Sequence, residues 1–114
     1  MPRIIGIHEF ALKPGVTDAE FEDAARAFVR ADLSEGTDGF LTSLIKSDRG
    51  TRRGQYGLLF EFESVEARDS WVTDDGITDK FKQFGVRHPE WMPAWAHMQS
   101  LAVEPIRWSD YQVL

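Results

Sequence analysis

The chain has 114 residues, of which 42% are hydrophobic and 28% are charged, and it carries a formal net charge of −6 with no cysteine. This length and balance predict one soluble globular domain that spans residues 1–114. The negative charge argues against binding to nucleic acid or to an anionic membrane surface, because both need a cationic face. The missing cysteine excludes disulfides and thiolate nucleophiles.

The sequence pattern also carries no targeting signal. No apolar run approaches the ~18 residues that span a bilayer. The start, Met1-Pro2-Arg3-Ile4, leads directly toward a strand and has none of the features of a signal peptide. We therefore expect a cytoplasmic protein.

The first predicted elements are a strand and a helix. Alternating apolar side chains indicate a strand from Ile4 to Leu12, which ends at the turn Pro14-Gly15. A capping box then opens a helix that runs to about residue 33 and presents one apolar stripe, with glycines in its exit loop. The capping box is Thr17 and Glu20, the stripe is Phe21, Ala24, Ala25 and Phe28, and the exit glycines are Gly36 and Gly39.

Two further strands are predicted from Phe40 to Ser47 and from Tyr56 to Glu63. The polar segment 48–55 between them has two glycines, which is typical of a hairpin loop. Its arginines, Arg49, Arg52 and Arg53, could grip an anion, but a solvated hairpin tip or a salt-bridge partner is the simpler interpretation.

The second helical region is broken into short helices. Ser64 is placed to cap the first of them, and Asp74-Asp75-Gly76 should end it. A short continuation ends at Gly85, and His88-Pro89-Glu90 opens another helix, since proline suits the first helical position. Pro105 indicates a loop, and the last strand is expected from residue 108 to 114.

The order strand, helix, strand, strand, helix, strand is that of a ferredoxin-like α+β unit with a four-stranded antiparallel sheet. Three segments resemble members of the dimeric α/β-barrel superfamily, which includes monooxygenase-like, EthD-like and NIPSNAP-like proteins. They are the start from Gly6 to Gly15, the hairpin from Lys46 to Gly50 leading into Tyr56, and the ending from Ser109 to Leu114. The resemblance implies a homodimer in which two sheets pack face to face and enclose a pocket.

Two helices cover only one face of such a sheet, so the other face needs a partner. On the third strand, every second residue from Tyr56 to Phe62 is apolar, and we assign this face to the helices. His8 of the first strand and Tyr111 of the last are assigned to the same face. The opposite face should then line the dimer lumen, as a mainly apolar surface with a few polar groups. Its expected members are Ile5, Ile7, Glu9, Ser43, Ile45, Gly57, Leu59, Glu61, Asp110, Gln112 and Leu114.

Three side chains are candidates for acid–base catalysis. Glu9 and Glu61 are expected on neighbouring strands of the lumen face, where two close carboxylates would raise at least one pKa and supply a general base. Partial solvation or pairing with arginines is the simpler alternative. His88, at a helix start, could transfer protons or bind haem, or could hydrogen-bond only its own loop.

The remaining histidines are less suggestive. His8 alternates with Glu9, so the two side chains point to opposite faces, and a hydrogen-bonded core histidine is expected there. His97 has no neighbourhood that suggests a site. The spacing of the three histidines predicts no metal site, and we expect no cofactor.

The aromatic segment 81–95 is either core or the wall of a pocket for a flat apolar ligand. We expect the ligand to contact Ile7, Leu59, Trp91, Trp95 and Gln112. The favoured function is a cofactor-independent monooxygenase or isomerase that holds a hydrophobic or aromatic metabolite in the lumen. The alternatives are a non-catalytic ligand-binding or assembly module and, third, a haem-binding protein.

Overall fold

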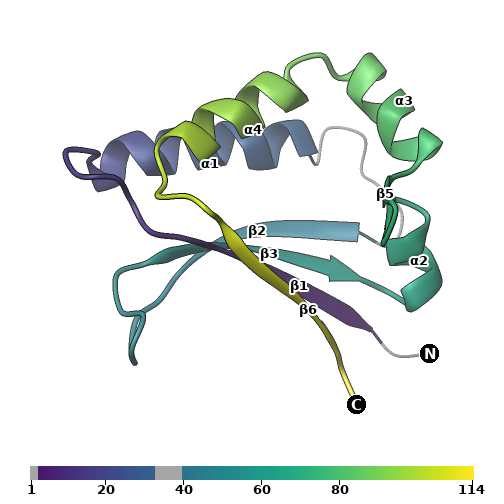
Figure 1. Cartoon of the computed structure of the whole chain (residues 1–114), viewed down its shortest axis with the longest axis horizontal. Coiled ribbons are helices and arrows are strands. Elements are labelled where there is room, and N and C mark those ends of the chain that lie inside the picture. The colour runs from purple at the N-terminus through teal and green to yellow at the C-terminus, as the bar shows by residue number, and fades with distance from the viewer. Residues whose placement is uncertain (1–2, 33–39) are drawn as a thin grey trace.

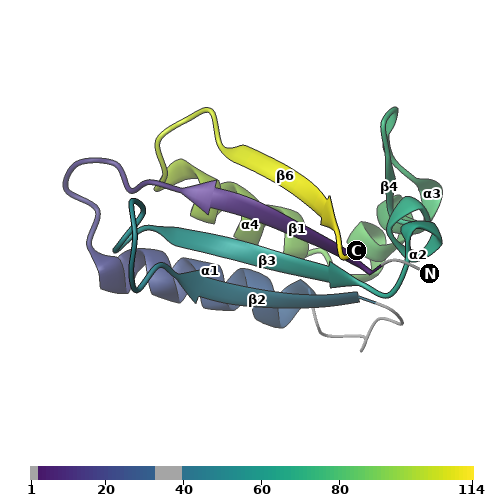
Figure 2. The ribbon, with the colours of Figure 1, turned by 90° about the horizontal axis from the view of Figure 1, so that it is seen from below.

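The computed structural model describes residues 3–32 and 40–114 and forms a four-stranded antiparallel sheet with helices on one face. The strand order is β2-β3-β1-β6, so β2 and β6 are the edge strands, and Figure 2 shows this order from the uncovered side. In chain order the elements are β1 (Ile4–Phe10), α1 (Asp18–Asp32), β2 (Phe40–Lys46), β3 (Tyr56–Phe62), α2 (Val65–Asp69), β4 (Val72–Thr73), β5 (Gly76–Ile77), α3 (Asp79–Arg87), α4 (Trp91–Ser100) and β6 (Arg107–Gln112).

The predicted order of elements is confirmed, with one addition. The segment expected only to break the second helical region forms a small hairpin, in which Val72 pairs with Ile77 and Thr73 with Gly76. Gly76 has a φ of 119°, a conformation that suits glycine at this tight turn. The end of the first predicted helix, at Leu33, and its exit glycines lie outside the described residues.

Side-chain caps fix where the helices begin. The Glu20 backbone N–H donates to Thr17 Oγ1 at 3.1 Å, and the Thr17 N–H donates to Glu20 Oε1 at 3.3 Å, so the predicted capping box is present. The Ala67 N–H donates to Ser64 Oγ at 3.1 Å at the start of α2, as predicted. Thr78 caps α3 in the same way, a cap that we did not predict.

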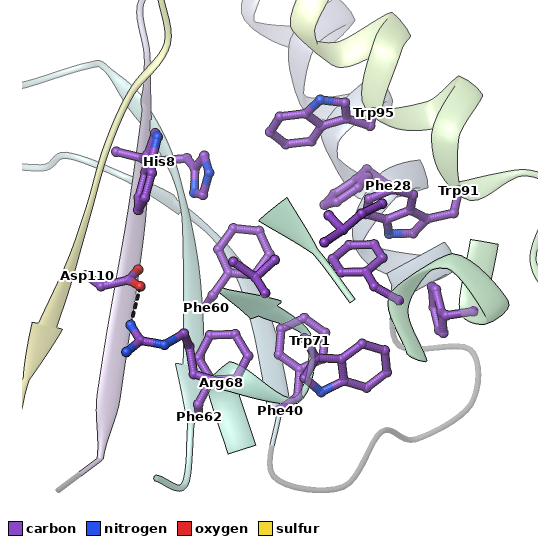
Figure 3. Close-up of a pocket in the computed structure, with 15 residues that line it drawn as sticks. His8, Phe28, Phe40, Phe60, Phe62, Arg68, Trp71, Trp91, Trp95 and Asp110 are labelled. Atoms are coloured by element: carbon purple, nitrogen blue, oxygen red, sulfur yellow. Dashed lines mark hydrogen bonds and ion pairs between the residues drawn. The ribbon is translucent and has the colours of Figure 1, made fainter. Parts of the chain in front are cut away.

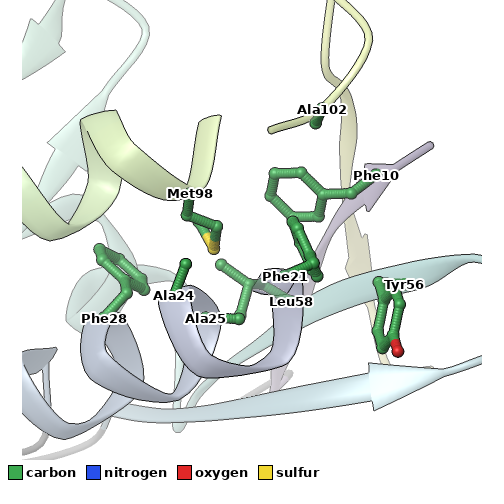
Figure 4. Packing of buried hydrophobic residues seen from close by; sticks show 9 residues of the cluster. All are labelled: Phe10, Phe21, Ala24, Ala25, Phe28, Tyr56, Leu58, Met98 and Ala102. Atoms are coloured by element: carbon green, nitrogen blue, oxygen red, sulfur yellow. The ribbon is translucent and has the colours of Figure 1, made fainter. Parts of the chain in front are cut away.

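The hydrophobic core lies between the sheet and the pair α1 and α4 (Figure 4). Phe10 and Leu58 extend from the central strands toward Phe21 of α1 and Met98 of α4, and all four are at most 1% exposed. The predicted apolar stripe of α1 therefore faces the sheet. This packing anchors α4 and leaves α3 and α2 beyond the end of the core, as Figure 1 shows.

The strand register confirms the assigned faces for three strands and reverses the fourth. Ile7 pairs with Leu59, so both lie on the open face, whereas His8 and Leu58 lie on the helix side. On β6, however, Asp110 pairs with Gly6 and Gln112 with Ile4. Both therefore lie on the helix side, and our placement of them in the lumen was wrong.

The reversal of β6 has a physical cause. Every residue of this edge strand is exposed, including those that lie on the helix side. Hydrophobicity consequently does not select the inner face there, and Tyr111, which we had assigned to the helices, faces outward at 56% exposure.

The open face of the sheet presents partly exposed apolar side chains. Leu41 is 48% exposed and Ile45 is 37% exposed, and these two residues of β2 flank Leu59 of the neighbouring strand β3. None of the helices in the described ranges combines the length and apolar character of a membrane span.

Candidate functional site

A cavity of about 310 Å³ lies between the helix side of the sheet and the helices α2, α3 and α4 (Figure 3). Ten of its fifteen lining residues are Phe or Trp. Two more, Val72 and Ile77, come from the β4–β5 hairpin, and the three polar ones are His8, Arg68 and Asp110. The cavity is therefore lined mainly by aromatic rings and lies inside one subunit, on the side of the sheet away from the open face.

The aromatic rings of the cavity wall pack against one another. Phe28 of α1 lies 5.5 Å from Trp91 and 5.2 Å from Trp95 of α4, measured between ring centroids. Phe81 of α3 meets Trp91 edge-on at 4.9 Å. Such contacts stabilise the wall beyond simple burial, so the predicted aromatic segment serves as core on one side and as cavity wall on the other.

His8 projects from β1 into this chamber, as Figure 3 shows. Its imidazole stacks on Trp108 at 5.9 Å and meets the edges of Phe60 and Trp95 at 5.1 and 5.8 Å. The Nδ1 atom is buried and has no hydrogen-bond partner among the described residues. Our prediction of a hydrogen-bonded core histidine was therefore wrong at this atom.

The surroundings of His8 favour its neutral form. Burial among aromatic rings lowers the pKa of the imidazole below its ordinary value of 6.5, because the charged form loses solvation. The negative charge of Asp110 acts in the opposite direction and raises this pKa. At neutral pH the cavity consequently presents an uncharged imidazole that can accept a proton.

An ion pair forms the other polar feature of the wall. Arg68 Nη1 of α2 lies 2.6 Å from Asp110 Oδ2 of β6, and the Arg68 Nε atom lies 2.7 Å from Asp69 Oδ1. The Asp110 carboxylate lies over Gly6, where a Cβ atom would approach Asp110 Oδ1 to 2.7 Å. Any side chain at this position of β1 would displace the Asp110 carboxylate.

The cavity opens along β6 and the small hairpin. Trp108 is 60% exposed and Ile77 is 52% exposed although both line it. The Arg68 and Asp110 side chains are about a quarter exposed, which places their ion pair at the rim. A ligand can therefore reach the chamber from the uncovered edge of the sheet.

The predicted carboxylate pair does not form within one chain. Glu9 pairs with Gly57 and Glu61 with Ile5, so the two glutamates share the open face but are four residues apart along the strands, or roughly 13 Å. Glu9 Oε2 instead lies 2.8 Å from Arg52 Nη2 of the hairpin loop. The arginine-paired alternative describes Glu9 correctly.

The other predicted site residues divide between the two sides of the sheet. Trp91 and Trp95 line the cavity, whereas Ile7 and Leu59 lie on the opposite face. His88 and Gln112 are not among the lining residues: His88 caps the C-terminal end of α3, with its ring 4.6 Å from Phe84 and its Nδ1 atom 3.5 Å from Glu90 Oε1.

Sequence reasoning missed the polar residues of the cavity. His8 was placed on the correct face, but nothing in the strand pattern distinguishes a lining histidine from a packed one. Asp110 was not identified as a cavity residue because β6 was assigned to the wrong face. Arg68, on its short helix, was not singled out. The available signals were one arginine near the end of the short helix α2 and one aspartate in the middle of β6. Across residues 3–32 and 40–114, no cluster of three or more His, Asp or Glu side chains could hold a metal ion.

Comparison with known proteins identifies the fold. No protein-family model matches the chain, and no curated protein matches it in sequence. Solved structures do match. One is a dimeric protein of unknown function and ferredoxin-like fold from Bacteroides fragilis, with 17% identity, a TM-score of 0.57 and coverage of 97% of this chain and 96% of that chain. The chain has the ferredoxin-like fold.

Two further neighbours share this fold. An antibiotic biosynthesis monooxygenase-like protein from Bordetella bronchiseptica has 17% identity and a TM-score of 0.62, covering 100% of this chain and 99% of that chain. A variant of SnoaB, a cofactor-independent oxygenase from Streptomyces nogalater, has 15% identity and a TM-score of 0.57, covering 97% of this chain and 92% of that chain. The fold-level resemblance predicted from the sequence is confirmed, with the subfamily left open.

Proposed function

We propose that the chain binds a small hydroxylated aromatic molecule in the cavity on the helix side of its sheet. The observation that carries this proposal is His8 Nδ1, a buried nitrogen without a hydrogen-bond partner in the described residues, on a wall made of aromatic rings. A buried polar atom left unpaired is costly. A turn of the imidazole that brings Nδ1 to the cavity surface would let a ligand hydroxyl donate to it and remove that cost.

The shape and chemistry of the cavity support an aromatic ligand. Its volume of about 310 Å³ is at the small end of the range for ligand pockets. Its rings offer stacked and edge-on contacts to a flat apolar molecule. Arg68 and Asp110 neutralise each other at the rim, so the walls do not select a strongly charged ligand.

The proposed reaction is of the cofactor-independent oxygenase or isomerase type. His8 would accept the proton of a ligand hydroxyl: the O–H bond breaks, an N–H bond forms, and the ligand keeps the electron pair as an electron-rich anion. That anion could rearrange, or react with dioxygen as co-substrate. The lowered pKa of His8 keeps the base in its unprotonated form at neutral pH, and the cofactor-independent oxygenase among the fold neighbours supports this class.

The alternative is a non-catalytic module that binds a ligand or serves in assembly. In either case we propose that two copies associate through the open faces of their sheets. Exposed apolar residues such as Leu41 and Ile45 support this proposal, because a soluble monomer rarely presents such a patch. The fold neighbour from Bacteroides fragilis is described as dimeric.

Calorimetric titration with naphthol and with its methyl ether tests the binding proposal. The two probes have the same ring system, but only naphthol donates a hydrogen bond. We expect naphthol to bind the native chain about threefold to tenfold more tightly, which is the value of one hydrogen bond. The preference should vanish in His8→Leu, and Trp95→Ala should weaken both probes.

Glu9→Gln, on the open face, is the matched control and should change neither affinity. If neither probe binds the native chain, the cavity does not hold this ligand class. If Glu9→Gln abolishes binding while His8→Leu leaves the naphthol preference intact, the ligand lies against the open face and the proposal is wrong.

A further inference from the structure

We infer that Asp110 is a positioning residue that supplies the counter-charge for His8 when the imidazole is protonated. This inference rests on the proposed function, in which His8 accepts a proton from the ligand. It extends that function to a residue on a different strand, and to Arg68, whose ion pair with Asp110 competes with His8 for the same carboxylate.

The strand register puts the two groups on one wall. His8 pairs with Trp108 and Gly6 pairs with Asp110 across β1 and β6, so His8 and Asp110 are diagonal neighbours on the helix side. Diagonal neighbours lie about 7–8 Å apart across a strand pair, which is within reach of a moving side chain. Both line the cavity, and Figure 3 shows both on the same wall of it.

Gly6 contributes to this arrangement because it has no side chain. A Cβ atom there would come within 2.7 Å of Asp110 Oδ1, so the carboxylate occupies the space that any other residue would fill. The absence of a side chain at residue 6 also leaves no inward-facing side chain of β1 between Asp110 and His8, the next inward-facing residue toward Phe10.

Among the described residues that line the cavity, Asp110 is the one negatively charged group that can pair with a protonated His8. Phe60 of β3, Trp95 of α4 and Trp108 of β6 contact the imidazole and do not titrate. Among the lining residues only Asp110 and Arg68 carry charge. An imidazolium among aromatic rings requires a nearby carboxylate, since a lone buried charge is strongly disfavoured.

Arg68 and a protonated His8 are alternative partners for the Asp110 carboxylate. In the structure Asp110 lies 2.6 Å from Arg68, while Arg68 also keeps Asp69 at 2.7 Å. If Asp110 turns toward a protonated His8, Arg68 retains Asp69 as a partner. Proton transfer from the ligand hydroxyl to Nδ1 changes no oxidation state, and Asp110 takes no proton in it; its charge stabilises the product ion pair.

Nuclear magnetic resonance titration of the His8 ring in the ligand-free chain tests this inference. Asp110→Asn should lower the pKa of His8, because the favourable carboxylate is lost, and Asp110→Glu should restore it toward the native value. Arg68→Gln should raise the pKa, because a competing cation is removed. His8→Leu identifies the resonance among the three histidines.

Asp69→Asn is the control with the same change in net charge, at a carboxylate that does not line the cavity. It should lower the His8 pKa less than Asp110→Asn does. Equal effects of the two variants, or an unchanged His8 pKa in Asp110→Asn, would overturn the inference. Because the titration uses no ligand, a shift in Asp110→Asn supports the inference even if naphthol does not bind, which separates its failure from that of the proposed function.

Discussion

At the scale of single residues, the site depends on two small departures from ordinary core packing. His8 replaces what would otherwise be an apolar residue on the inner face of β1, and its Nδ1 atom lacks a partner in the described part of the chain. Gly6, one inward position earlier, leaves room for Asp110. The sequence shows both residues, but their meaning depends on what the opposite strand places against them.

The burial of His8 predicts a pH dependence of stability. Its pKa is lower in the folded chain than the ordinary 6.5 of an exposed imidazole, so the unfolded chain binds the proton more readily. The free energy of unfolding should therefore be fully retained above about pH 6.5 and should fall as the pH drops from there toward the lower pKa of the folded chain.

Urea denaturation as a function of pH measures this effect. His8→Leu should remove the part of the pH dependence that lies below about pH 6.5, a limit set by the ordinary pKa and the downward direction of its shift. An identical pH profile in the native chain and in His8→Leu would show that the imidazole is not desolvated.

Two glycines make a matched pair for testing the close approach of Asp110. Gly6→Ala should destabilise the fold by about 0.5–1 kcal/mol, because the new Cβ would push the end of the Asp110 side chain away from Arg68 and weaken their ion pair. Gly85→Ala, in α3 with no atom within 4 Å of the added carbon, should instead stabilise it by about 0.5–1 kcal/mol. Chemical denaturation compares them, and a harmless Gly6→Ala would contradict the packing described here.

At the scale of elements, periodicity and caps predicted most of the fold. The alternation of β1 and β3, the stripe of α1 and the capping box at Thr17 each follow from local physical chemistry and are present in the structure. The hairpin β4–β5 was not predictable in the same way, because strands of two residues are too short to carry a periodic signal.

Thr78 connects this hairpin to α3 and provides a test at the same scale. Its Oγ1 accepts from the Phe81 N–H at 3.4 Å and donates to the Ser70 carbonyl at 2.7 Å. Thr78→Ala should cost about 1–2 kcal/mol of unfolding free energy and weaken naphthol binding, because Ile77 and Phe81 beside it line the cavity. Thr73→Ala, on β4, is the control, because the hydrogen bonds of the Thr73 hydroxyl stay within the hairpin. Equal effects of the two variants would contradict the role of Thr78.

At the scale of the whole molecule, the sheet separates two surfaces that the sequence could not tell apart. Apolar residues alternate on both faces of β1 and β3, so the pattern predicts two buried faces but not which of them encloses a ligand. The placement of the cavity on the helix side depends on how α3 and α4 lie across the cavity from Phe60 and on the register of an exposed edge strand. Both are tertiary properties.

The open face gives a prediction about assembly. We expect the native chain to be a dimer at micromolar concentration in light scattering. Ile45→Glu, a charge placed on the open face, should shift it to a monomer, whereas Val86→Glu, on the exposed side of α3, should leave the dimer unchanged. A native monomer, or a dimer that survives Ile45→Glu, would contradict association through the sheet.

In the proposed complex the ligand lies between the sheet and the helices of one subunit. A crystal structure of the chain with naphthol tests it most directly. We expect the naphthol rings to lie against Trp95 and Phe60, with the hydroxyl oxygen within hydrogen-bond distance of His8 Nδ1. Density for the probe against Ile7 and Leu59 on the open face, with the aromatic cavity empty, would contradict it.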